Sequence, residues 1–209
     1  MTTQTACLPV QGVFGLPLQG ILAGFRRFSV AEYHRLIQIG ILTEDDNLEL
    51  LEGYLVHKMT RNPPHDSALH RTLKRLNRLL TAGWDVRVQT AVTLTQSEPE
   101  TDLAVVREDV DEYATRHPGP ADIGLVIEVA DTTLLGDRTD KGRIYARAGI
   151  ECYWIVNLHD AQVEVYTGPS GPTASPGYGQ RKDHRVGDTV PLVLDGVQAA
   201  AIAVTDLLP

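Results

Sequence analysis

The chain has 209 residues, of which 43% are hydrophobic and 22% are charged. This composition is typical of a globular protein, and the length suffices for one domain whose core needs no disulfide or structural metal. With 19 Lys and Arg against 27 Asp and Glu, the net charge of −8 argues against a simple nucleic-acid-binding protein, because phosphate affinity comes mainly from clustered cations.

The first predicted elements are a helix and a hairpin. Ser29 and Glu32 match a capping box and Gly40 is typical of a helix end, so we expect a helix between them. Two short apolar runs that meet at Gly53 predict a β-hairpin over residues 48–59.

A second helix is predicted from about His65 to Leu80, because leucines recur at spacings of four, three and four residues and form an apolar face. The other side of this helix carries four basic residues, Arg71, Lys74, Arg75 and Arg78. They belong to a stretch over residues 61–87 with six basic and two acidic side chains, whereas residues 98–140 hold three basic and twelve acidic ones. This asymmetry suits a cation-dependent site for an anionic substrate, although two solvated faces of opposite sign would give the same pattern.

The remaining pattern predicts mainly strands. We expect β-structure over residues 85–95, 103–106, 124–130, 152–157 and 163–167. The third of these is apolar on both faces except for one carboxylate, which is typical of a central strand. A third helix is predicted from Asp137, as its N-cap, to Ala148, and the Gly-, Pro- and Ser-rich stretch 168–180 predicts a flexible loop.

The element order predicts a single α+β domain over residues 28–209. Residues 1–27 are rich in Gly, Pro and Gln without periodicity, so we expect a poorly ordered lead-in before it. The N-terminus lacks the basic start and apolar run of a signal peptide, and no stretch is long and apolar enough to span a membrane. Cys7 and Cys152 lie far apart and match no metal or redox pattern, which fits a cytoplasmic protein.

Two carboxylates stand in unusual settings. Asp102 precedes the apolar run that starts at Leu103, and Glu128 interrupts an apolar strand, where a buried charge needs a partner or a cation. Two such carboxylates on neighbouring strands, with a carbonyl oxygen, would form a hard-oxygen site for Mg²⁺ or Mn²⁺. Alternatively, Glu128 pairs with an arginine such as Arg138 or Arg143.

Three further residues are candidates for the same site. Lys141 follows Glu128 by thirteen residues on the next predicted helix, which could return its ammonium to the site or leave it in water. Glu49 alternates with leucines in the predicted hairpin, so it either points into the pocket or faces solvent. His65 follows two prolines and is either a polar group at a helix start or a phosphate contact.

The order of segments resembles the Uma-two-type family of restriction-endonuclease-like proteins, within the PD-(D/E)xK nuclease superfamily. The resemblance covers residues 28–209 and rests on FSVAEY (28–33), LELLEGYLV (48–56), NPPH (62–65), EPETDLAVV (98–106), LVIEVAD (125–131), DRTDKGRIYARAGI (137–150) and YWIVN (153–157). It implies a restriction-endonuclease-like mixed β-sheet core flanked by helices. It also implies that Asp102 and Glu128 hold the metal, with Glu49 and Lys141 at the other active-site positions.

The chain departs from the superfamily motif at two positions. Thr101 stands where the motif has proline, and Ala130 stands where it has lysine two residues after the glutamate. Lys141 resembles a migrated replacement for that lysine.

The function implied by the resemblance is a Mg²⁺- or Mn²⁺-dependent endonuclease that hydrolyses DNA. Glu49, Asp102, Glu128 and Lys141 would be catalytic, and His65 and the four basic helix residues would contact DNA. A catalytically idle nucleic-acid or protein-interaction module of the same fold, or a nucleotide phosphodiesterase, are the alternatives. We expect DNA as the partner, no membrane, and a homodimer as one option for the oligomeric state.

Overall fold

The computed structural model describes residues 25–209, so nearly all of the predicted lead-in over residues 1–27 lies outside the described part. The core is a six-stranded sheet in the order β3-β4-β5-β6-β7-β8. Its strands are β3 (Trp84–Ala91), β4 (Glu100–Arg107), β5 (Ile123–Ala130), β6 (Cys152–Asn157), β7 (Gln162–Pro169) and β8 (Tyr178–Arg185). Only the β5–β6 pair is parallel, so the sheet is mixed, as predicted.

The other elements are helices and two separate hairpins. They are α1 (Val30–Gln38), the hairpin β1 (Leu48–Leu51) and β2 (Tyr54–His57), α2 (Pro63–Leu79), α3 (Leu134–Gly136), α4 (Gly142–Ala148), and the hairpin β9 (Thr189–Leu194) and β10 (Val197–Ala203). A π-helical turn, Asp137–Lys141, joins α3 to α4. We call the continuous helical segment over residues 134–148 the α3–α4 helix. It is the crossover that the parallel β5–β6 pair requires.

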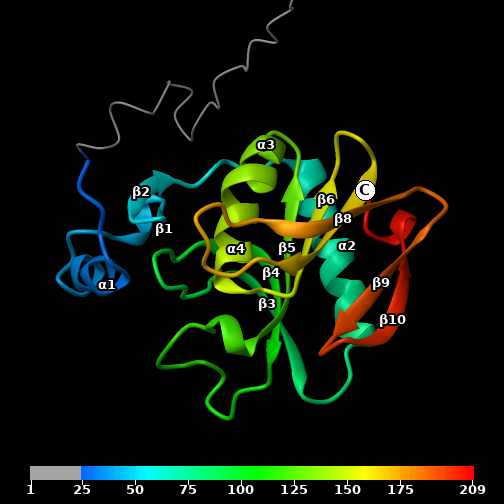
Figure 1. The fold of residues 1–209 in the computed structure, drawn as a ribbon, viewed down its shortest axis with the longest axis horizontal. Coiled ribbons are helices and arrows are strands. Elements are labelled where there is room, and N and C mark those ends of the chain that lie inside the picture. Colours follow the sequence, from blue (N-terminus) through cyan, green and yellow to red (C-terminus); the bar gives the residue numbers. More distant parts are fainter. Residues whose placement is uncertain (1–24) are drawn as a thin grey trace, which may run out of the picture.

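Side chains of the sheet alternate between two cores. On one face, residues such as Leu103 and Val105 pack with α2 and the β9–β10 hairpin. On the opposite face, Ala104 and Val106 pack with Ile144 and Tyr145 of α4 and with the first hairpin. Figure 1 shows the resulting layers, with α4 in front of the sheet and α2 behind it.

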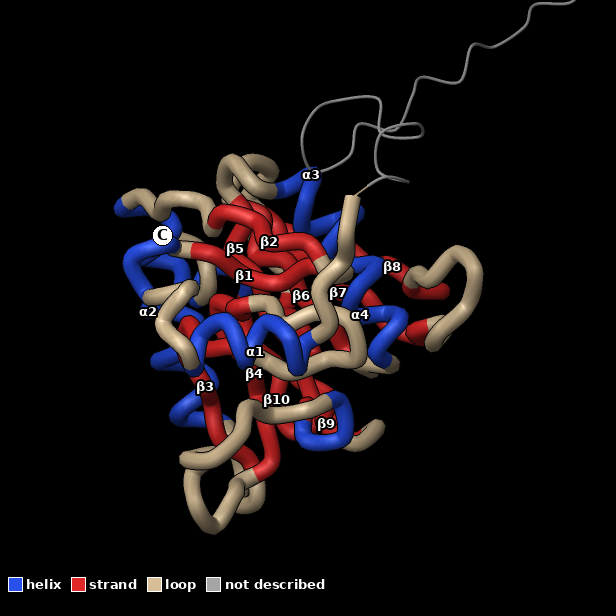
Figure 2. Tube along the Cα trace, turned by 90° about the vertical axis from the view of Figure 1, so that its left-hand side faces the viewer, coloured by secondary structure: helices blue, strands red, loops and turns tan. Residues whose placement is uncertain are grey.

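The N-terminal elements follow the predicted pattern. The Ser29 hydroxyl accepts a hydrogen bond from Glu32 N–H, and the Glu32 carboxylate accepts one from Ser29 N–H, which completes the capping box of α1. The hairpin is tied to this segment because Phe28 N–H donates to the carbonyl of Gly53. Figure 2 shows α1 and the β1–β2 hairpin together on the face turned toward the viewer. Within residues 25–209, no helix is both long and apolar enough to cross a membrane.

Several predicted boundaries were wrong. β3 ends at Ala91 rather than at residue 95, and β4 begins at Glu100 rather than at residue 103. The third helix begins at Leu134 rather than Asp137, whose carboxylate is buried inside it and accepts a hydrogen bond from Thr133 Oγ1 at 2.6 Å. The predicted loop over residues 168–180 is shorter, because β7 continues to Pro169 and β8 begins at Tyr178. β8 is an edge strand with mostly exposed polar residues, so it lacks the apolar alternation that predicts a strand.

Candidate functional site

Asp102 and Glu128 come together because of strand register. β4 and β5 are antiparallel with Leu103 opposite Ile127, and one step further places Asp102 opposite Glu128. Opposite residues of an antiparallel pair project on the same face. Val129 N–H donates to Asp102 Oδ2 at 2.8 Å, and Asp102 N lies 3.4 Å from Glu128 Oε2. The structure therefore brings both predicted carboxylates to one point.

Lys141 reaches this point from the π-helical turn. Its Nζ lies 2.9 Å from Glu128 Oε1 and 3.4 Å from the carbonyl oxygen of Glu100, and its side chain is only 16% exposed. Neither arginine considered as the partner of Glu128 takes that place, because Arg138 pairs with Glu164 and Arg143 with Glu52. The predicted return of the lysine to the carboxylates is thus the arrangement observed.

The sequence reasoning did not single out Tyr145 or Asp137 as members of the site. The hydroxyl of Tyr145, which is fully buried, donates to Glu128 Oε1 at 2.6 Å, and Asp137 lines the same pocket. Asp137, Lys141 and Tyr145 follow one another at intervals of four residues. That spacing places side chains on one side of a helix and was the available signal.

Glu49 and His65 lie at the site from opposite directions. Glu49 is buried on β1, and its Oε2 accepts a hydrogen bond from Glu100 N–H at 3.0 Å. His65 lies in the first turn of α2, where Asn62 caps its N–H, and its Nε2 is 3.1 Å from Asp102 Oδ2. His65 therefore contacts a site carboxylate, which neither of the two readings of the sequence anticipated.

The four basic residues of α2 lie away from this pocket and do not line it. Arg71, Lys74 and Arg78 are exposed, and Arg75 pairs with Asp206 at 2.6 Å. Their contact with DNA stays a prediction. The cations at the mouth of the pocket are instead Lys58 and Arg61, which lie 2.6 and 2.9 Å from the two carboxylate oxygens of Glu100.

The pocket is small and acidic. Its cavity has a volume of about 110 Å³, enough for several waters or a hydrated ion. Three cations line it, Lys58, Arg61 and Lys141, together with six carboxylates, Glu49, Glu100, Asp102, Glu128, Asp131 and Asp137. With every one of these groups ionised the lining carries 3 − 6 = −3 charges.

Burial raises the pKa of some acidic groups of the pocket, whereas pairing lowers the pKa of another. Burial raises the pKa of Glu128 to about 8 despite the adjacent Lys141 ammonium, and burial raises the pKa of Asp137 to about 6. For Asp102, burial is outweighed by the hydrogen bond from His65 and the charge of Lys141, so its pKa is lowered. The surrounding carboxylates likewise overcome burial and raise the pKa of Lys141. One carboxylate is thus held ionised and its neighbour is held ready to take a proton or a cation.

The oxygen donors of the pocket suit an open site for a divalent ion. Among residues 25–209, no three His, Cys, Asp or Glu side chains form a cluster that could hold a metal. The hydrogen bonds that Asp102 accepts within this range all fall on Oδ2, so Oδ1 is left for another ligand. Mg²⁺ is commonly bound through one or two carboxylates and keeps several waters. The pair of Asp102 and Glu128 fits that mode of binding and does not fit a closed structural metal site.

Comparison with known proteins places the chain in a family. Residues 30–203 match the Uma2 family, whose description is "Putative restriction endonuclease". The chain belongs to this family. The chain also resembles a crystal structure described as "a putative nuclease belonging to DUF820" from Anabaena variabilis, with a TM-score of 0.62 and 15% sequence identity over 82% of this chain and 96% of that one. No protein with a curated description matches. The predicted family and restriction-endonuclease-like fold are confirmed.

Proposed function

We propose that this chain is a divalent-cation-dependent endonuclease that hydrolyses DNA phosphodiester bonds at the pocket around Asp102 and Glu128. The observation that carries the proposal is the convergence of these two carboxylates, opposite one another on neighbouring strands, with the buried Lys141 ammonium 2.9 Å from Glu128. Membership of the Uma2 family supports the same activity.

The charge of the pocket supports a requirement for a cation. Carboxylates outnumber cations in the lining even when Glu128 is protonated, with five carboxylates against three cations, 3 − 5 = −2. The lining would therefore repel a phosphodiester, so the substrate needs additional positive charge at the carboxylates. Asp102 and Glu128 would hold Mg²⁺ or Mn²⁺ through oxygen atoms. When bound, such an ion supplies Lewis-acid stabilisation of phosphoryl oxygens and an acidified water.

The protein's own groups have separable roles in this proposal. Lys141 orients the attacking water and stabilises negative charge that develops on the phosphoryl group. His65 donates to Asp102 and holds its carboxylate in one orientation. Glu49 fixes the backbone next to Asp102 by accepting from Glu100 N–H. Lys58 and Arg61, at the mouth, are placed to contact phosphates that flank the scissile bond.

The decisive experiment is cleavage of plasmid and single-stranded DNA with Mn²⁺ and with Mg²⁺. It compares the wild-type chain with Asp102→Ala and with the matched control Asp45→Ala, which changes an exposed acid that does not line the pocket. We expect cleavage by the wild-type and control proteins and none by Asp102→Ala. Equal cleavage by all three would refute the proposal.

Two other outcomes identify the alternative functions. If calorimetry detects no binding of Mn²⁺ or Mg²⁺, the chain is a catalytically idle module of the same fold, which the negative pocket would also suit. If the ions bind and mononucleotide or dinucleotide esters are hydrolysed while DNA is not, the chain is a nucleotide phosphodiesterase.

A further inference from the structure

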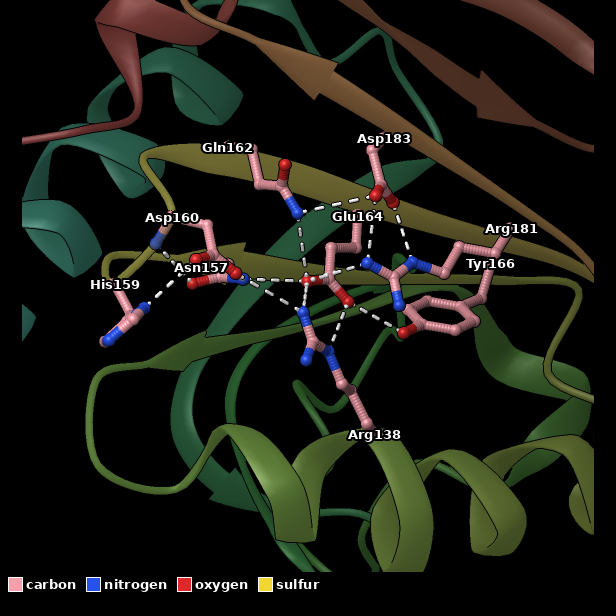
Figure 3. A network of polar contacts seen from close by, with 9 residues as sticks. All are labelled: Arg138, Asn157, His159, Asp160, Gln162, Glu164, Tyr166, Arg181 and Asp183. Atoms are coloured by element: carbon pink, nitrogen blue, oxygen red, sulfur yellow. Dashed lines mark hydrogen bonds and ion pairs between the residues drawn. The ribbon is translucent and has the colours of Figure 1, made fainter. Parts of the chain in front are cut away.

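A second polar cluster lies two strands from the pocket and is centred on Glu164 of β7. Its carboxylate is fully buried, and five polar side chains contact its two oxygens (Figure 3). These are Arg138, Asn157, Gln162, Tyr166 and Arg181. Arg138 alone contacts both oxygens, with Nε 3.0 Å from Oε2 and Nη2 on Oε1. This bidentate geometry fixes the arginine in orientation as well as in distance.

The cluster is aligned with the pocket by the register of the sheet. Glu128 on β5 pairs with Ile155 on β6, and Ile155 pairs with Glu164 on β7. The three side chains therefore form one row on the same face of the sheet, with an apolar residue between two carboxylates. The α3–α4 helix covers this face.

The helix spans this row and is attached on both sides of β6. In the centre, the hydroxyl of Tyr153 on β6 donates to the carbonyl of Asp137 at 3.1 Å. Toward β5, Lys141 reaches Glu128, and toward β7, Arg138 reaches Glu164. All three helix residues belong to the π-helical turn, a distortion that often marks functional positions.

We infer that the Arg138–Glu164 ion pair is a positioning device that fixes the rotation of this helix and thereby holds the Lys141 ammonium against Glu128. Within the π-helical turn, the hydrogen bond from Tyr153 acts at one point and does not by itself fix the rotation of the turn about the helix axis. The Tyr145–Glu128 and Arg143–Glu52 contacts lie further along the helix, in α4. The two cations, three residues apart and directed to opposite sides of β6, prevent that rotation together. The catalytic consequence rests on the proposed function, whereas the placement of Lys141 does not.

The first test observes Lys141 directly by the ¹H–¹⁵N signal of its side-chain ammonium in labelled, metal-free protein. The wild-type signal should exchange slowly with water because the group is buried and paired. In Arg138→Ala the signal should exchange much faster or disappear. Arg181→Ala is the matched control, since it removes the other arginine from the same carboxylate but lies on β8 rather than on the helix, and it should leave the signal unchanged.

The second test is Mn²⁺-dependent cleavage. Arg138→Ala should lower kcat about 10- to 100-fold, the range for a misplaced reacting group, with KM unchanged. Adding Arg138→Ala to a Lys141→Ala protein should cause no further loss, because the arginine acts only through the lysine. Should Arg138→Ala fail to fold, Arg138→Lys, which keeps the charge without the two-point contact, takes its place and should give the same exchange result.

The results separate this inference from the proposed function. A Lys141 signal that is equally protected in Arg138→Ala and Arg181→Ala refutes the positioning role, whatever the activity. Loss of protection only in Arg138→Ala supports it, even if no variant cleaves DNA. Additive losses of activity from Arg138→Ala and Lys141→Ala would show that the arginine acts independently of the lysine, and would also overturn the inference.

Discussion

The buried Glu164 carboxylate predicts a defined loss of stability in acid. Burial alone would raise its pKa, but the hydrogen bonds from Arg138, Tyr166 and Asn157 outweigh burial and lower the pKa from 4.5 to about 2. A carboxylate with a lowered pKa in the folded state stabilises the fold above pH 4.5, where it is ionised in both states. That contribution is lost as the pH falls from 4.5 to 2.

The size of the effect follows from the shift. A difference of 4.5 − 2 = 2.5 pKa units corresponds to about 3.5 kcal/mol at about 1.4 kcal/mol per unit, of which about 3 kcal/mol is lost by pH 2, where the folded state is half protonated. Because Arg138 and Arg181 are 30% and 37% exposed, salt should reduce this value. A loss of about 3 kcal/mol is a large part of the 5–15 kcal/mol typical of a domain.

The assay is urea unfolding of the wild-type chain and of Glu164→Gln at several pH values between 7 and 2. Other carboxylates titrate in both proteins, so the quantity of interest is the difference between their free energies of unfolding. We expect the advantage of the wild type to be constant above pH 5 and to shrink by about 3 kcal/mol as the pH falls to 2. Glu151→Gln, at an exposed glutamate, is the control and should show no such change. A difference between wild type and Glu164→Gln that is independent of pH would refute the reasoning.

Three further outcomes are expected. Lys141→Ala should lower kcat for DNA cleavage about 10²- to 10⁴-fold, while calorimetry shows nearly unchanged Mn²⁺ affinity. Lys141→Arg should recover little of that activity. Full activity of the alanine variant would exclude the lysine from the mechanism. Mn²⁺ at 100 times its Kd should raise the free energy of unfolding by about 2.7 kcal/mol, and Asp102→Asn should abolish the accompanying shift in Tm; an unchanged shift would place the ion elsewhere. Gly124→Ala should destabilise the fold by about 1–3 kcal/mol in thermal melts, because a Cβ there would lie 2.6 Å from the Trp84 ring. Gly136→Ala is the control and should not destabilise the fold in this way, because the space around Gly136 is open.

The two carboxylates could be predicted from the sequence because their signal is local. Each lies at or inside an apolar strand, and strand alternation together with antiparallel pairing brings such residues to one face. The partner of Glu128 was not decided by the same reasoning, because Arg138, Lys141 and Arg143 all follow on one helix. The π-helical turn adds a residue to that helix and changes the direction of each side chain, and nothing in the sequence marks where such a turn falls.

The errors at the start of the third helix and at β8 have different physical causes. Asp137 is a favourable N-cap residue, but in the structure its carboxylate lies inside the helix, where it accepts a hydrogen bond from Thr133 and lines the pocket together with Lys141. β8 is stabilised by its pairing with β7 rather than by an apolar pattern of its own, so its strand character is a tertiary property. The Glu164 cluster likewise joins residues from several elements and has no local signature.

Because Lys141 lies on a helix, the neighbouring strand β5 does not have to supply the active-site lysine. The position two residues after Glu128 does not have to carry a polar side chain and holds Ala130, which is fully buried. Apart from the single glutamate, β5 therefore remains an apolar strand on both faces. Carboxylates and ammonium are thereby supplied by separate structural parts that can change independently. A substitution on the helical side of the helix–sheet contact, at Arg138 for example, is expected to shift the ammonium while Asp102 and Glu128 keep their places. Adjusting reactivity in this chain therefore does not require altering the strands that form its core.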